Sequence, residues 1–181
     1  MSYLIRAVDP ERDAQRLVDI YNPYIEKTTI TYEYDSLTRE QFLERINSII
    51  KDYPYIVMEE DGEIIGYAYA SCFNERSAYD WDADLAIYLD MNCRGKGAGS
   101  MLFAKLLEIL EKCGFVNAYS LIDIPNPGSE SLHKKFGFTK TGSYVHSAYK
   151  FDKWLDMGIY SKCISDTDKP GKIDRDWKKY L

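Results

Sequence analysis

The chain has 181 residues, 45% of them hydrophobic and 29% charged, which is the balance of one globular domain rather than of a disordered chain. Its formal net charge of −6 argues against a nucleic-acid partner, because binding along a phosphate backbone needs an excess of Lys and Arg. No apolar run is long enough to cross a membrane and no signal peptide opens the chain, so we expect a cytoplasmic protein that binds no membrane.

The first half of the chain predicts two helices between strands. Asp9-Pro10 is typical of a helix start, and apolar residues recur at helical spacing from Leu17 to Tyr24. A second helix is expected after Thr38, because Thr38-Arg39-Glu40-Gln41 has the pattern of a capping box. Strands are expected at 3–8, 55–58 and 64–70.

The last two of these strands are expected to form a hairpin. Asp61-Gly62 lies between them, and this pair supplies the positive φ angles that a tight turn needs. Gly66 falls inside the second strand of the hairpin, where it predicts a bulge or close packing.

The second half is organised around a glycine-rich turn, Arg94-Gly95-Lys96-Gly97-Ala98-Gly99, which is followed by Ser100. The turn joins a strand expected at 84–89 to a helix with apolar residues from Leu102 to Leu110, and a further strand follows at 118–124. Together they predict a β-α-β unit with two parallel strands. Backbone N–H groups of such a turn, with the helix dipole, can bind a phosphate or pyrophosphate. The alternative is a turn that only connects a strand to a helix.

The remainder predicts a short helix at 129–135, strands at 143–151 and 157–164, and a charged tail on the surface. No internal repeat or long linker divides the chain. We therefore expect one domain over 1–165 and a tail over 166–181. The four cysteines stand far apart and without a histidine at ligand spacing, so reduced thiols are expected, and no metal site.

Two motifs resemble the GNAT acetyltransferase superfamily in their sequence and in their order. The turn from Arg94 to Gly99 resembles its acetyl-CoA motif, Gln/Arg-x-x-Gly-x-Gly/Ala, and Asn126 with Leu132-His133-Lys134-Lys135-Phe136-Gly137-Phe138 resembles a second block. The resemblance implies an acetyl-CoA-dependent N-acetyltransferase. It also implies an α/β (α+β) GNAT fold, with a mixed, mostly antiparallel central sheet flanked by helices and a splayed β-α-β acetyl-CoA site.

Within this superfamily the chain is similar to the phosphinothricin and methionine sulfoximine N-acetyltransferases. The similarity spans about residues 5 to 161 and includes Tyr21-Asn22, Arg76-Ser77-Ala78-Tyr79-Asp80-Trp81 and Tyr149-Lys150. It implies acetylation of the primary amine of a small amino acid or analogue, as in detoxification, by a homodimer. Two alternatives stay open: a GNAT enzyme for another amine, such as a polyamine, an aminoglycoside or a peptide, and a non-catalytic acyl-CoA-binding module.

The resemblance assigns acetyl-CoA-binding roles in three places. Backbone N–H groups of the turn are expected on the pyrophosphate, with charge added by Arg94 and Lys96. These N–H groups belong to Gly95, Lys96, Gly97, Ala98, Gly99 and Ser100. Backbone groups of Ile87 and Leu89 are expected to pair with the pantetheine arm. Asn126 is expected to contact the same arm, although an Asn between two prolines is also an ordinary turn residue.

The resemblance also assigns two catalytic residues. An ammonium group must lose a proton before its nitrogen can attack a thioester, so a base is needed. Asp84 aligns with a Glu of the family, and its shorter side chain favours a relay through water; the alternative is a solvated acid at the start of a strand. His133 matches the family's proposed catalytic histidine and would support departure of the thiolate, unless it is a packing or surface residue.

An amino-acid acceptor needs a cation for its acid group as well. The resemblance matches Arg76 and Lys150 to this role, with Tyr79 and Trp81 as walls of the acceptor site. For each of these residues the alternative is an ordinary surface charge or a buried aromatic ring.

Overall fold

A seven-stranded sheet runs through the computed structural model, which describes residues 3–93 and 97–181. Its strands are β1 (Tyr3–Ala7), β2 (Tyr55–Glu60), β3 (Glu63–Cys72), β4 (Asp82–Leu89), β5 (Asn117–Ile124), β6 (Thr139–Lys150) and β7 (Lys153–Cys163). They lie in the order β1-β2-β3-β4-β5-β7-β6. Within the described residues only β4 and β5 pair in parallel, so the sheet is mixed and mostly antiparallel, as predicted.

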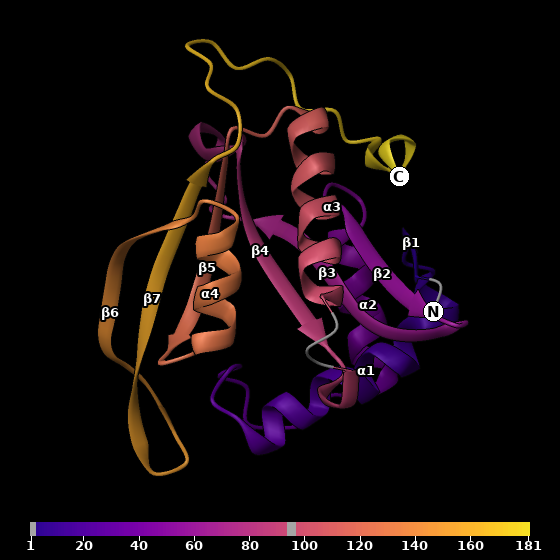
Figure 1. The fold of residues 1–181 in the computed structure, drawn as a ribbon, viewed down its shortest axis with the longest axis vertical. Helices are drawn as coiled ribbons and strands as arrows, with labels where there is room; N and C mark the ends of the chain where they lie inside the picture. Colours follow the sequence, from indigo (N-terminus) through magenta and orange to yellow (C-terminus); the bar gives the residue numbers. More distant parts are fainter. Residues whose placement is uncertain (1–2, 94–96) are drawn as a thin grey trace.

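Four α-helices cover the two faces of this sheet (Figure 1). Helices α1 (Pro10–Lys27) and α2 (Arg39–Ile49) pack on one face, around a core that includes Tyr55 and Tyr67. Helices α3 (Ala98–Cys113) and α4 (Pro127–Lys135) lie on the other face, where α3 buries Leu102 and Phe103. The expected α+β architecture is therefore confirmed. Across the described ranges, no helix combines the length and the apolar character that spanning a lipid bilayer requires.

The local signals of the first half are confirmed. The Asp9 carboxylate accepts from the backbone N–H of Arg12 at the start of α1, and Thr38 and Gln41 form a reciprocal capping box on α2. These contacts satisfy backbone donors that the first turn of a helix leaves without partners. In the β2–β3 hairpin, Asp61 and Gly62 have φ angles of 51° and 90°.

Gly66 meets both of the conditions predicted for it. The β2–β3 register shifts between Met58 and Glu59, opposite Gly66, which marks a bulge. A Cβ built on Gly66 would lie 2.4 Å from Leu89 Cδ2 and 2.8 Å from the carbonyl oxygen of Tyr88. Any larger residue here would therefore displace the last two residues of β4.

β4 and β5 separate soon after they meet. Their pairing covers Asp82 to Asp84 on β4 and Asn117 to Tyr119 on β5. β5 then stays paired with β7 as far as Ile124, while β4 stays with β3 as far as Leu89. The two strands diverge toward the lower edge of the sheet in Figure 1. The splayed β-α-β unit that the sequence implied is thus present.

The C-terminal tail differs from the surface segment predicted for it. Trp177 is 2% exposed, belongs to the core beneath α3, and donates its indole N–H to the carbonyl oxygen of Ile50 at 3.3 Å. Ile173 is buried as well, and residues 177–180 form a short 3-10 helix. The sequence did not predict this contact, because Ile173 and Trp177 are isolated apolar residues among charged ones and show no helical or strand periodicity.

Candidate active site

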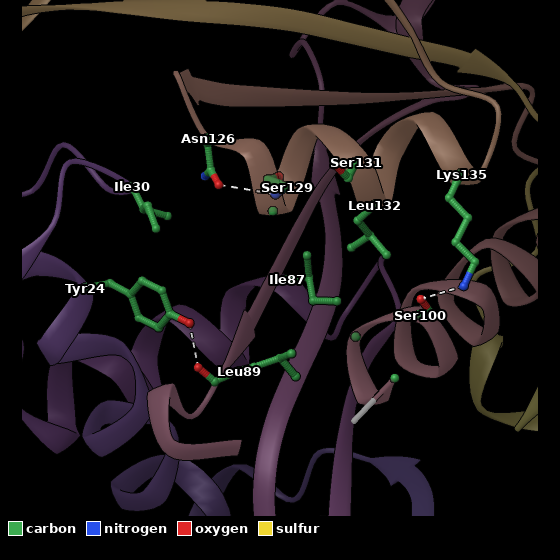
Figure 2. Close-up of a pocket in the computed structure, with 13 residues that line it drawn as sticks. Tyr24, Ile30, Ile87, Leu89, Ser100, Asn126, Ser129, Ser131, Leu132 and Lys135 are labelled. Carbon is green, nitrogen blue, oxygen red and sulfur yellow. Dashed lines mark hydrogen bonds between the residues drawn. The ribbon is translucent and has the colours of Figure 1, made fainter. Parts of the chain in front are cut away.

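A cleft of about 470 Å³ opens between β4, the start of α3 and the length of α4. Figure 2 shows Ile87 and Leu89 on its floor, with Ser100 on one side and residues of α4 on the other. Its lining residues are Tyr24, Ile30, Ile87, Leu89, Gly97, Gly99, Ser100, Asn126, Gly128, Ser129, Ser131, Leu132 and Lys135. Residues predicted to bind acetyl-CoA are therefore brought together here, with Asn126 at the opposite end from Ser100.

The floor of the cleft is the part of β4 that has left β5. Ile87 and Leu89 lie beyond Asp84, where β4 has no partner on the β5 side among the described residues, so its backbone is open to a ligand there. The carbonyl oxygen of Leu89 already accepts from the Tyr24 hydroxyl at 2.5 Å, which fixes the end of β4 against α1 (Figure 2). An extended amide chain could pair with such a strand edge in the manner of a further strand.

The start of α3 needs two of its glycines for different reasons. Gly97 precedes the helix with a φ of 82°, a left-handed conformation that other residues adopt only with strain. A Cβ on Gly99 would lie 3.2 Å from Leu89 Cδ1 and would narrow the cleft. Ala98, the first residue of α3, is buried. Arg94, Gly95 and Lys96, which were also predicted to bind the pyrophosphate, lie outside the described residues.

Asn126 serves as the N-cap of α4. Its Oδ1 accepts from the backbone N–H of Ser129 at 3.2 Å, while its own N–H donates to Glu130 at 3.0 Å. Glu130 also accepts from the Tyr160 hydroxyl, which ties the start of α4 to β7. The Asn126 amide nitrogen has no hydrogen bond to another described residue, so it is the group left to contact a ligand in the cleft.

Asp84 lies on the opposite face of β4 from the cleft. Side chains alternate along a strand, so Asp84 and Tyr88 face α1 and α2, whereas Leu85 and Ile87 face α3. The Asp84 Oδ1 is buried and has no hydrogen-bond partner among the described residues. Burial raises the pKa of this carboxyl to about 6, opposed by a hydrogen bond from the backbone N–H of Leu85. A carboxylate so placed is a stronger base than an exposed one.

An aromatic row runs outward from the neighbourhood of Asp84. Asp84 pairs across the sheet with Tyr119, whose ring stacks on Phe73 at a centroid distance of 4.1 Å. Phe73 in turn contacts Tyr79 at 5.7 Å. Arg76 is exposed in the same loop and forms no ion pair with any described residue. Tyr79 thus lies at the outer end of the row, and Arg76 lies three residues before it in the same loop.

Trp81 and Lys150 lie elsewhere than predicted. Trp81 lies two residues before Ala83, so both side chains face the α3 side of the sheet. The indole N–H of Trp81 donates to the carbonyl oxygen of Gly171 at 2.6 Å. Lys150 is 3% exposed and donates to the carbonyl oxygen of Thr31 at 2.7 Å, and burial lowers its pKa. In the structure both side chains therefore donate to backbone carbonyl groups, Trp81 to Gly171 and Lys150 to Thr31, and their acceptor roles stay predictions.

His133 also departs from its expected position. The ring is 3% exposed and lies in the core against Phe103, Phe138 and Tyr160, rather than in the cleft. Its Nδ1 is 2.8 Å from the carbonyl oxygen of Ser129, while Nε2 is buried without a partner among the described residues. Burial lowers its pKa, so the ring is neutral. α4 places the ring there because His133 occupies its buried face.

The connection between α1 and α2 contributes contacts of Glu33 and Thr29, two residues that the sequence did not single out. Glu33 forms an ion pair with Arg45 at 2.5 Å and accepts from the Tyr21 hydroxyl. Asp123 of β5 accepts from Thr29 at 2.5 Å and from Tyr32 at 3.1 Å. These contacts hold the connection over the α1/α2 face of the sheet. These contacts could not be predicted from the sequence, because the residues that form them are far apart along the chain.

Comparison with known proteins identifies the family. The acetyltransferase (GNAT) domain family matches residues 5–159. The chain is 33% identical to a phosphinothricin N-acetyltransferase from Streptomyces coelicolor, over 84% of this chain and 91% of the relative. It is 31% identical to one from Streptomyces viridochromogenes, over 83% and 82%. The crystal structure of a phosphinothricin acetyltransferase from Sinorhizobium meliloti in complex with acetyl-CoA superimposes with a TM-score of 0.90, at 30% identity over 94% of each chain.

The chain belongs to the GNAT acetyltransferase family. It is an acetyl-CoA-dependent N-acetyltransferase, so the predicted family, enzyme class and acetyl donor are confirmed. The cleft suits this donor, since it offers an open strand edge, a glycine-bearing helix start and the Asn126 side-chain amide nitrogen, which no described residue engages.

Proposed function

We propose that this enzyme acetylates the primary amine of a small amino acid or amino-acid analogue of the phosphinothricin or methionine sulfoximine type. The observation that carries the proposal is Asp84, a buried carboxylate beside the point where β4 and β5 separate, with one oxygen that no described residue engages. The acceptor class follows from the relatives named above. Arg76 and Tyr79 of the β3–β4 loop supply a cation and a ring for an acid-bearing acceptor.

The reaction needs one proton acceptor and a fixed approach. The amine nitrogen bonds to the acetyl carbonyl carbon, the carbon–sulfur bond breaks, and the thiolate takes up a proton to become free CoA. Asp84, directly or through a water, accepts the proton that the ammonium group loses. Its pKa of about 6 leaves it ionised at neutral pH and still basic enough for this transfer. Ile87 and Leu89 hold the donor along β4, so the acetyl group is oriented before the amine arrives.

A thiol-release assay over a panel of amines tests this function. We expect the highest kcat/KM with phosphinothricin or methionine sulfoximine, lower values with common amino acids, and little turnover when the acid group is removed from the acceptor. Asp84→Asn protein, purified in parallel, controls for contaminating acetyltransferases. Turnover of a polyamine, an aminoglycoside or a peptide, with none of any amino acid, would overturn the proposed acceptor class.

We also propose a homodimer, as the resemblance implies. Large apolar side chains stay exposed along the β6–β7 hairpin: Tyr144 (54%), Val145 (70%), Phe151 (51%) and Trp154 (57%). Such a cluster is more than a monomer ordinarily leaves to water, and β6 is an edge strand. Sedimentation equilibrium at micromolar concentration should give twice the chain mass. A mass of one chain under those conditions would contradict the dimer.

A further inference from the structure

The C-terminal tail, residues 166–181, packs across one end of the domain. Figure 1 shows it in yellow, passing from the end of β7 across the end of α3. The backbone N–H of Asp174 donates to the carbonyl oxygen of Cys113, the last residue of α3, at 2.8 Å. The cleft in which we expect acetyl-CoA lies where α3 begins, and none of the described residues that line it belongs to the tail. The tail is therefore remote from the acetyl donor.

Buried and charged side chains fix the tail to the domain. Ile173 and Trp177 are 8% and 2% exposed and belong to the core beneath α3. Arg175 donates to the carbonyl oxygen of Asp52 at 3.1 Å, and its guanidinium group lies over the ring of Tyr53 at 5.1 Å. These contacts hold the tail in one place, because leaving it would expose both apolar side chains to water.

The loop that joins β3 to β4, residues 73–81, carries Arg76 and Tyr79, which are proposed above to meet the acceptor. The start of this loop is held by Phe73, whose ring stacks on Tyr119 of β5 at 4.1 Å. Arg76 lies near the middle of the loop and forms no ion pair with any described residue. Its place therefore depends on how the two ends of the loop are held.

The end of the loop is held through both the backbone and the side chain of Trp81. Its carbonyl oxygen accepts from the backbone N–H of Val116 at 2.9 Å, which joins it to the start of β5. Its indole N–H donates to the carbonyl oxygen of Gly171 at 2.6 Å. Within the described ranges this is the one hydrogen bond between the β3–β4 loop and the tail. Trp81 therefore links the loop to a segment that is itself anchored in the core.

We propose that Trp81 is a positioning residue for the acceptor: its hydrogen bond to Gly171 ties the end of the β3–β4 loop to the tail and so fixes the place of Arg76 and Tyr79. An arginine that meets an acid group in a forked geometry loses affinity when its loop can move, because binding must then order the loop as well. The inference rests on the proposed function, in which this loop binds the acceptor. It follows that the tail affects binding of the acceptor and not of the donor.

Two matched tryptophan substitutions test this role. Trp81→Phe and Trp177→Phe each keep an aromatic ring and remove one indole N–H that donates to a backbone carbonyl, of Gly171 and of Ile50 respectively. KM and kcat are measured at saturating acetyl-CoA with phosphinothricin, methionine sulfoximine and the best amine of the panel above, and the Kd for CoA by calorimetry. We expect Trp81→Phe to raise KM for the acceptor about threefold to fivefold, with kcat and the Kd for CoA nearly unchanged.

Trp177→Phe separates positioning from stability. The hydrogen bond of Trp177 is more buried than that of Trp81, so Trp177→Phe should have the lower Tm of the two variants and yet the acceptor KM of the wild type. A merely structural role of Trp81 would instead make the rise in KM follow the loss of Tm. An equal rise of KM in Trp177→Phe, or a wild-type KM in Trp81→Phe, would overturn the proposal.

Ile173→Ala loosens the tail beside Gly171 without changing Trp81. Ile173 lies two residues after Gly171, so this variant should raise the acceptor KM as Trp81→Phe does; Ile173→Val replaces it if Ile173→Ala melts below the assay temperature. A raised KM in Trp81→Phe alone would mean that the indole contacts the acceptor directly, and this too would overturn the proposal. If the proposed function fails, the wild type itself acetylates no amino acid of the panel, whereas the outcomes above are read with an active wild type.

Discussion

Asp84 of β4 and Tyr119 of β5 are the last pair of residues that joins these two parallel strands. Beyond this pair the strand edge of β4 is open, and Ile87 and Leu89 become the floor of the cleft in which we expect the acetyl donor. Asp84 faces α1 and α2, whereas the cleft lies on the side of α3 and α4. We therefore expect the donor and the acceptor to approach from opposite faces of the sheet and to meet where β4 and β5 separate.

Replacing Asp84 with Asn should separate activity from stability. Loss of the base should lower kcat/KM by about 10²-fold or more and remove the acidic limb of the pH–rate profile near pH 6. The folded-state pKa is raised above the unfolded value, so ionisation between about pH 4 and pH 6 destabilises the folded state. Asp84→Asn should therefore gain about 1–3 kcal/mol of unfolding free energy at pH 7, measured in urea, and nothing below pH 4.

Asp84→Glu is the control for this experiment, because it keeps the carboxylate and the resemblance implies a Glu at this position. It should retain most of the activity and the acidic limb. An unchanged pH profile in Asp84→Asn would remove Asp84 from the mechanism.

Asn126 should have two roles that different substitutions separate. Asn126→Asp keeps a side-chain oxygen that can cap Ser129, so this variant should melt close to the wild type while binding acetyl-CoA more weakly, because the amide donor is gone. Asn126→Ala loses both groups and should also lose about 1 kcal/mol of unfolding free energy. Calorimetry with acetyl-CoA and thermal melts measure the two effects. Wild-type affinity in Asn126→Asp would show that the amide nitrogen contacts no donor.

Gly97 should matter for binding beyond its effect on the fold. Gly97→Val places a side chain at a φ of 82° and should cost about 1–2 kcal/mol. Gly62→Val is a matched control, because Gly62 has a φ of 90° in the β2–β3 turn and, like Gly97, no described atom within 4 Å of an added Cβ. Both variants should lose similar stability, but only Gly97→Val should weaken acetyl-CoA binding in calorimetry. Equal donor affinity in the two variants would contradict a role of this turn in binding.

The sequence predicted the fold where local signals and periodicity decide it. Asp9, the Thr38 capping box and Asp61-Gly62 each specify a local backbone geometry, and the structure has all three. The place of the donor cleft followed as well, since the glycine turn and Ile87 belong to one strand–turn–helix segment. Such features depend on neighbours in sequence, so residue types alone predict them.

The acceptor side could not be predicted in the same way, because long-range packing decides which way a polar side chain points. Lys150 has the same chemistry whether it faces a ligand or the carbonyl oxygen of Thr31, 119 residues away. The face of the sheet on which Trp81 lies is known only once the structure shows that Ala83, two residues later on the same side, packs in the core under α3. The burial of Trp177 could not be predicted either, since its contacts with α3 and Ile50 come from remote parts of the chain.

Substitution of His133 tests whether this residue is catalytic or only packs in the core, and we expect packing to be its main role. His133→Phe places another aromatic ring among Phe103, Phe138 and Tyr160 and should leave kcat/KM within about twofold of the wild type. The folded-state pKa of His133 lies below its unfolded value of 6.5, so its contribution to stability is present above pH 6.5 and is lost as the pH falls. Urea unfolding from pH 8 to pH 5 should therefore show a smaller acid-induced loss in His133→Phe than in the wild type. A hundredfold loss of kcat/KM in a stably folded His133→Phe protein would instead restore the proton-transfer role that the resemblance implies.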